Sequence, residues 1–208
     1  MKDIITNAEA TVMKILQKGL SPKLTFHNIE HTQRVVAACQ EIGKCINISE
    51  DDREITLLAA WFHDTGYTKT NVAHEEASKM IALQFLMQYD YDLQKTRQIL
   101  SCIEATRKDV TPQHITEKVI CDADAYHLST NHYFECLALL RKEWELVWDA
   151  KVSDAQWYRQ NLKFLQHHHY YTTYGKTVLE RRKQKNLEEN LRKFVSMVNT
   201  PGDGNGSL

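Results

Sequence analysis

The sequence predicts an all-α fold, and three observations support this prediction. The chain of 208 residues contains only 7 glycines and 3 prolines, so turn residues are scarce. No run of alternating β-branched residues is bounded by turns. Apolar residues instead recur every three or four positions, which is the period of a helix with one buried face. We therefore expect helices and no sheet.

Composition and charge exclude several classes of protein. The formal net charge is −1 and the sequence pI about 6.8, so no overall field favours nucleic acid or an anionic membrane as a partner. The chain has no signal peptide and no apolar run long enough for a membrane span, so we expect it in the cytoplasm. Its five cysteines include no Cys-x-x-Cys pair, which favours buried, reduced thiols. The length suits one domain, expected at residues 1–199.

The first two helices follow from their apolar periodicity. One is predicted at residues 5–16, closed by Gly19 and the proline that follows. The second is predicted from about residue 26 to residue 45. His31 lies on its inward stripe, among apolar residues spaced at helical intervals. This is an unusual position for histidine and marks it as a candidate functional residue.

A third helix is expected to start after Ser49, whose side chain suits an N-cap before an acidic first turn. It runs apolar into the adjacent pair His63-Asp64. Both side chains can face one cation only if the backbone between them leaves regular helix. Thr65-Gly66 supplies a helix breaker directly afterwards. The pair is therefore expected at the end of this helix.

The middle of the chain predicts three more helices. A polar loop leads into a helix that holds His74, and a second helix surrounds residues 99–103. Thr111 as N-cap and Pro112 at the first helical position predict the start of the third. Asp124 lies on this third helix, next to its inward stripe.

The remaining helices are predicted at residues 131–149, from a cap at Ser153 to about residue 167, and, as a basic helix, at 174–198. The Gly-rich residues 200–208 are expected to be a disordered tail or a linker cut from a longer chain.

Four residues combine into a candidate metal site: His31, His63, Asp64 and Asp124. Two imidazoles and two carboxylates suit one divalent transition metal, namely Mn²⁺, Fe²⁺, Co²⁺, Ni²⁺ or Zn²⁺. Mg²⁺ and Ca²⁺ prefer ligand sets made of oxygen alone. Four protein ligands on a six-coordinate ion would leave positions for water and substrate, as catalysis requires.

With these four residues the sequence resembles the HD-domain metal-dependent phosphohydrolases, which share the ordered pattern of a His, a His-Asp pair and a distant Asp. Residues 27–35, 59–67 and 120–124 look like the three landmark segments of that family, all within residues 24–130. The resemblance implies an orthogonal helical bundle of the HD-domain type. It also implies hydrolysis of a phosphoester, very often in a nucleotide.

Two further likenesses concern the rest of the chain. Residues 131–198 look like the C-terminal helices of a small stand-alone subgroup of the family. The chain is also similar to the HD-type front part of some Pycsar anti-phage effectors, which carry a membrane-spanning part behind it. The second likeness implies that residues 200–208 are a cut linker.

Two catalytic roles are expected at the metal site. A metal-bound water is the expected nucleophile, and Asp64 is the candidate that orients it and accepts its proton. His74, beyond the His-Asp pair, is the candidate acid for the leaving oxygen. A purely structural metal site is the alternative to catalysis.

Four residues are candidates for binding the substrate: His27, Arg34, Lys69 and Arg107. His27 lies one turn before His31 and can contact the substrate or a metal ligand, or it can be a solvated histidine at a helix end. The planar guanidinium of Arg34 suits a phosphate, although a surface ion pair with Glu30 explains it equally well. Exposed positive charge is the alternative for the other two.

The sequence therefore predicts a metal-dependent phosphohydrolase acting on a small phosphorylated metabolite, with a nucleotide as the first candidate. The rival is a non-catalytic module of the HD type that binds a nucleotide or serves as a regulatory domain, including the front part of a longer membrane-associated effector. Metal identity and oligomeric state do not follow from the sequence. The tryptophan-bearing helices after residue 131 offer a surface for a dimer.

Overall fold

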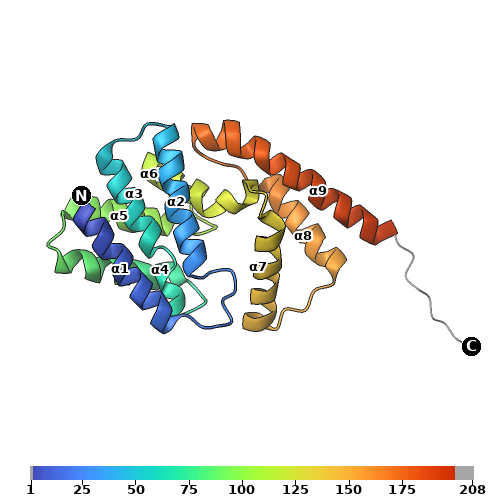
Figure 1. The fold of residues 1–208 in the computed structure, drawn as a ribbon, viewed down its shortest axis with the longest axis horizontal. Coiled ribbons are helices and arrows are strands. Elements are labelled where there is room, and N and C mark those ends of the chain that lie inside the picture. Colours follow the sequence, from blue (N-terminus) through green and yellow to red (C-terminus); the bar gives the residue numbers. More distant parts are fainter. Residues whose placement is uncertain (1, 200–208) are drawn as a thin grey trace, which may run out of the picture.

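The computed structural model describes residues 2–199 and contains, over that range, helices and loops but no strand (Figure 1). The α-helices are α1 (Lys2–Gly19), α2 (Ile29–Cys45), α3 (Glu50–Phe62), α4 (His74–Gln88), α5 (Leu93–Ala105), α6 (Ile115–Asp124), α7 (Tyr133–Trp148), α8 (Asp154–His167) and α9 (Glu180–Asn199). Three short helical turns are η1 (Thr65–Thr68), η2 (Ala125–Ser129) and η3 (Gly175–Leu179). The predicted all-α class is confirmed. The tail predicted at 200–208 lies outside the described residues.

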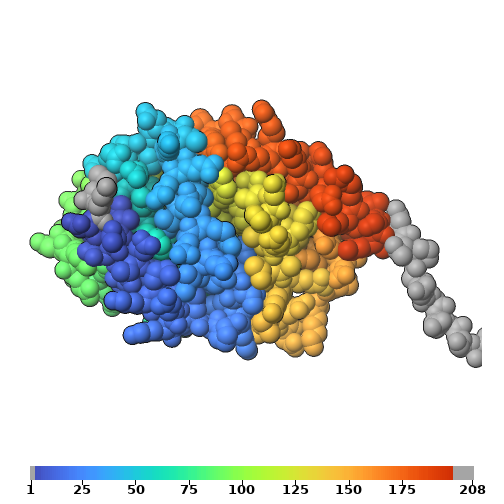
Figure 2. Space-filling view, in the orientation of Figure 1, coloured from blue at the N-terminus to red at the C-terminus, as the bar shows by residue number. Residues whose placement is uncertain are grey.

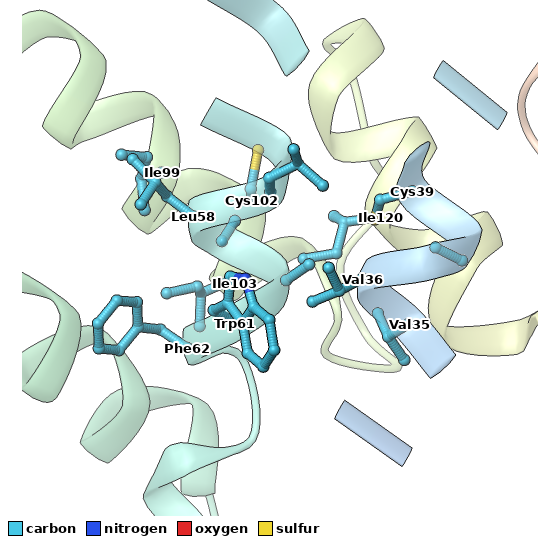
Figure 3. Close-up of a cluster of buried hydrophobic side chains, with 14 of the residues drawn as sticks. Val35, Val36, Cys39, Leu58, Trp61, Phe62, Ile99, Cys102, Ile103 and Ile120 are labelled. Carbon is cyan, nitrogen blue, oxygen red and sulfur yellow. The ribbon is translucent and has the colours of Figure 1, made fainter. Parts of the chain in front are cut away.

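Helix α3 is at the centre of the larger core. It packs against α1, α2, α4, α5 and α6. Its residues Leu58 and Phe62 are fully buried in a cluster with Ile103 of α5 and Ile120 of α6 (Figure 3). Because α3 is buried on nearly all sides, its C-terminal end has a fixed position in the molecule. His63 and the residues after it continue from that end.

Helices α7 to α9 form a second, smaller cluster beside the first (Figure 1). Its buried side chains include Tyr133, Leu137, Trp157 and Leu165. Trp157 is thus a core residue, as expected of a buried aromatic anchor, whereas Trp148 remains half exposed. Among the helices that the structure describes, none has both the length and the apolar content needed to cross a membrane.

Two predicted helix starts were wrong, and side-chain caps explain both differences. The helix predicted from residue 26 begins at Ile29, because the Asn28 side chain accepts a hydrogen bond from the His31 N–H at 3.0 Å. The helix predicted from Thr111 begins at Ile115. There the side chain of Glu117 accepts hydrogen bonds from the N–H groups of residues 113 and 114, so the preceding threonine and proline stay in the loop.

The C-terminal end of α6 is fixed by Asp122, a residue that is 1% exposed. Its carboxylate accepts hydrogen bonds from the N–H groups of Tyr171 and Thr172, at 2.7 and 2.9 Å, and from the Thr172 hydroxyl at 2.7 Å. A Cβ on Gly175 would approach this carboxylate to 2.3 Å, so glycine is required there. The segment before α9 thereby anchors α6 two residues before Asp124.

We expect Glu117→Gln to destabilise the fold at neutral pH by about 1–2 kcal/mol, because a charged cap is replaced by a weaker neutral one. Burial raises the pKa of Glu117, but hydrogen bonds from Ser101, Gln113 and His114 outweigh burial and hold it below its ordinary value. A carboxyl with a lowered folded pKa contributes stability above its unfolded pKa and loses it as the pH falls through the folded value.

The difference in unfolding free energy between wild type and variant should therefore shrink below about pH 4.5. Urea unfolding between pH 7 and pH 3.5 measures it. Glu188→Gln, at an exposed position on α9, is the control and should leave stability unchanged at every pH. A constant or growing difference at low pH would contradict the capping role.

Candidate metal centre

His31 lies in the first turn of α2 and is 2% exposed. The Asn28 cap holds its backbone N–H, so the start of the helix and the direction of the imidazole are set together. Its ring packs against the ring of Phe26, with centroids 5.0 Å apart. The prediction that this histidine faces inward from an apolar stripe is confirmed.

The backbone leaves regular helix between His63 and Asp64. This change of conformation allows the two adjacent side chains to face the same point. His63 is the C-cap of α3 and keeps helical dihedrals, whereas Asp64 has φ −105° and ψ 4°, outside the helical region. The His63 Nδ1–H donates to the carbonyl of Ala60 at 2.8 Å. In the neutral ring this bond leaves Nε2 unprotonated and free to bind a metal.

At Gly66 the backbone of η1 comes very close to the backbone of α4. The described glycines all have negative φ, so Gly66 breaks the helix without a left-handed conformation. Its N–H donates to the Ser78 hydroxyl at 2.8 Å. A Cβ at this position would lie 1.9 Å from the carbonyl oxygen of His74, so a side chain would push α4 away from η1.

The ligand atoms of His31, His63 and Asp124 lie within 4.8 Å of one another. Asp124 is the last residue of α6, and its Oδ1 lies 3.1 Å from Nε2 of His31 and 3.9 Å from Nε2 of His63. Oδ2 of Asp64 lies 3.3 and 3.2 Å from the same two nitrogens. Three separate helices therefore bring the four predicted metal ligands together.

The donor set fits a divalent transition metal. Oδ2 of Asp64 is buried and has no hydrogen-bond partner, which is costly for a carboxylate oxygen unless a cation satisfies it. Burial lowers the pKa of His31, but the carboxylates of Asp124 and Asp64 raise it to about 9. Burial raises the pKa of Asp64, but the charge of His63 and contacts with the neighbouring imidazoles hold it well below its ordinary value. Four donors of this kind suit one borderline ion.

His74 contacts the second oxygen of Asp64. Its Nε2 lies 3.2 Å from Oδ1, so the Asp64 carboxylate has the imidazoles of His31 and His63 on one oxygen and His74 on the other. His74 begins α4 directly after Ala73, which has φ 51°. This left-handed conformation costs an alanine roughly 1–2 kcal/mol. Strain of this kind often accompanies a functional position.

Three aromatic rings are stacked beside the metal ligands. Tyr67 lies against His74, with centroids 3.8 Å apart and planes at 18°, and against His27 on its other face, at 4.7 Å and 28°. Burial raises the pKa of Tyr67, so its phenol remains neutral. The stack places His27 beside the site, and its ring lies 5.6 Å from that of His31.

Glu143 of α7 is a site residue that the sequence analysis missed. It is fully buried, and its carboxylate accepts hydrogen bonds from the N–H groups of Phe26 and His27 at 2.8 and 2.9 Å. Its other oxygen lies 2.5 Å from Nδ1 of His27. Burial raises the pKa of Glu143, but its contacts with His27 lower it below the ordinary value. Glu143 follows Cys136 and Leu140 at helical spacing, so the signal that singled out His31 was present here too.

The other predicted substrate ligands differ in their positions. Arg34 lines a pocket beside the metal ligands, and its Nη1 lies 3.8 Å from the Glu30 carboxylate. Lys69 is exposed after η1 and does not line that pocket. Arg107 also lies outside it and pairs with Asp109 and Glu104. Phosphate binding by these three residues stays a prediction.

The pocket has a volume of about 490 Å³ and lies between α2, the α6–η2 segment and α7. Figure 2 shows the blue surface of α2 bordering the yellow surface of the residues that follow α6. His31 and Asp124 belong both to the pocket lining and to the metal cluster. The volume is within the range of small-molecule sites, and the pocket extends to His31 and Asp124.

Comparisons with known proteins agree with this geometry. The family model described as HD domain matches residues 28–129, the range that carries all four ligands. The crystal structure of a predicted HD superfamily hydrolase from an uncultured Thermotogales bacterium has a TM-score of 0.57 and 19% sequence identity. The match covers 95% of this chain and 92% of the crystallised protein, so the two proteins share their fold over nearly the whole length. No curated protein matches the chain. Residues 28–129 form an HD domain, and this part of the chain therefore belongs to the HD-domain family.

Proposed function

We propose that this protein is a metal-dependent phosphohydrolase that cleaves a phosphoester of a small metabolite, with a nucleotide as the leading substrate class. One observation carries the proposal. Two imidazoles and two carboxylates converge at the edge of a pocket of about 490 Å³, where the buried Oδ2 of Asp64 lies 3.2 and 3.3 Å from the two imidazole nitrogens but makes no regular hydrogen bond. A closed structural metal site would have no such pocket beside it.

His31, His63, Asp64 and Asp124 would hold one Mn²⁺, Fe²⁺, Co²⁺, Ni²⁺ or Zn²⁺ ion. When bound, such an ion lowers the pKa of a coordinated water and polarises a phosphoryl oxygen. Asp64 is ionised at neutral pH, because contacts with the imidazoles hold its pKa low despite burial. We assign Oδ2 to the ion, and Oδ1, which lies 3.2 Å from Nε2 of His74, to orient the attacking water and accept its proton.

His74 and His27 take the outer roles in this proposal. Nε2 of His74 lies 3.2 Å from Oδ1 of Asp64, and we assign this imidazole to carry a proton to the leaving oxygen. Glu143 holds Nδ1 of His27, so Nε2 on the opposite side of that ring remains to contact the substrate. Arg34 can pair its guanidinium with two phosphoryl oxygens.

Asp64→Ala is expected to lose both bound metal and activity, because it removes a metal ligand and the proposed proton acceptor together. We expect turnover of nucleotides or of p-nitrophenyl phosphate, assayed with Mn²⁺, Co²⁺ or Ni²⁺, to fall roughly 100-fold or more. Metal analysis of the purified variant should show less bound metal than wild type. Asp109→Ala removes an exposed carboxylate outside the pocket and should change neither quantity. Unchanged turnover in Asp64→Ala would refute the proposal.

Glu143→Gln tests the link between α7 and the metal centre without changing the size of the side chain. The amide oxygen can still accept hydrogen bonds from the N–H groups of Phe26 and His27. The amide NH₂, however, cannot accept a hydrogen bond from His27 Nδ1. The ring is then expected to change tautomer, and kcat/KM should fall roughly 10–100-fold.

Circular dichroism and the melting temperature should show that Glu143→Gln retains its fold. Glu145→Gln, two residues further along the same helix and exposed to solvent, is the matched control and should keep wild-type kinetics. Equal kcat/KM in Glu143→Gln and wild type would show that Glu143 only fastens α7 to the loop before α2.

A further inference from the structure

The pocket beside the metal ligands has an apolar floor. Its buried lining comes from α2, α6 and α7 and consists mainly of small or aliphatic side chains, namely Val35, Ala38, Ala123, Cys136 and the half-buried Leu139. Tyr126 adds an aromatic ring at the edge. A floor of this kind suits the uncharged body of a metabolite, such as a base or another flat ring.

The rim of the same pocket is acidic. Glu30, Glu41 and Glu135 belong to its lining, and Arg34 is the one arginine or lysine among the described residues that line it. The side chains of Glu30 and Glu135 are 76% and 74% exposed, so they face the solvent through which a substrate arrives. Carboxylates thus outnumber guanidinium groups three to one on this rim.

Arg182 of α9 lies near this rim but does not line the pocket. Arg182 of α9 lies 3.9 Å from the Glu41 carboxylate and donates to the Tyr126 hydroxyl at 3.3 Å. The same Glu41 oxygen accepts hydrogen bonds from the hydroxyls of Tyr126 and Tyr174. Arg182 is therefore engaged with the outer side of the rim and does not line the pocket.

We propose that the pocket selects substrates with a single phosphoryl group on an uncharged body, and discriminates against di- and triphosphates of the same body. This inference rests on the proposed function and specifies its substrate class. One guanidinium can pair with two oxygens of one phosphoryl group. Each further phosphoryl group adds negative charge among carboxylates, where repulsion opposes binding. The carboxylates can instead accept hydrogen bonds from hydroxyl or amino groups of the body.

The test uses one body with different numbers of phosphoryl groups. Hydrolysis-resistant methylene analogues of adenosine mono-, di- and triphosphate are titrated calorimetrically into the full-length, metal-loaded chain at low ionic strength. We expect the monophosphate analogue to bind about tenfold more tightly than the triphosphate analogue. This ratio should fall in high salt, which screens exposed charges. Equal or tighter binding of the triphosphate analogue, or no binding of any of the three, overturns the proposal.

Variants that change one charge test whether the rim carboxylates cause the preference for the monophosphate analogue. Glu135→Lys should lower the ratio about tenfold, and Glu135→Gln should lower it less while avoiding a cation in the first turn of α7. Glu188→Lys makes the same charge change on α9, outside the pocket, and should preserve the ratio. An equal effect of Glu188→Lys and Glu135→Lys would refute a role for the rim.

Turnover separates this proposal from the one on which it rests. If the order of affinities holds but no phosphoester is hydrolysed with any tested metal, phosphohydrolase activity is refuted and the selectivity of the pocket stands. If phosphoesters are hydrolysed but kcat/KM for adenosine triphosphate equals or exceeds that for the monophosphate, the selectivity is refuted and the activity stands.

Discussion

The structure depends on the mutual neutralisation of four ionisable side chains, of which His31, His63 and Asp64 are buried and Asp124 is partly exposed at the pocket. A buried carboxylate is costly when it is alone, because it loses several kcal/mol of hydration. Here the imidazoles of His31 and His63 lie between the carboxylates of Asp64 and Asp124, so each like-charged pair has an opposite partner within reach. The central, fully packed helix α3 makes this possible, since it holds one half of the cluster in a fixed position.

Each metal ligand lies at or near a helix end, where unsatisfied backbone groups make the chain sensitive to its caps. Asn28 fixes the start of α2, Glu117 fixes the start of α6, and Asp122 fixes the end of α6 against the segment before α9. Gly66 adds a backbone contact that only glycine permits. The geometry of the ligands is thus set mainly by polar groups that do not belong to the site.

Helical periodicity, together with the position of polar residues on apolar stripes, was enough to predict the all-α fold and the four residues that meet. It predicted His31 because that residue interrupts an apolar face. The two helix starts at Ile29 and Ile115 were missed, since they depend on which side chain turns back to cap the backbone. Glu143 also interrupts an apolar face, but its partners at residues 26 and 27 are more than a hundred positions away, so the helix pattern did not reveal its role.

The position of Glu143 has a consequence for how this unit can be divided. Residues 28–129 carry all four predicted metal ligands, yet the carboxylate that contacts His27 and one wall of the pocket come from α7. A fragment cut at the limits of the matched family region would keep the predicted ligands of the metal ion. It would lose the part of the pocket wall that α7 provides. The unit that builds the pocket is therefore larger than the matched family region, and any chimera built from this protein must include α7.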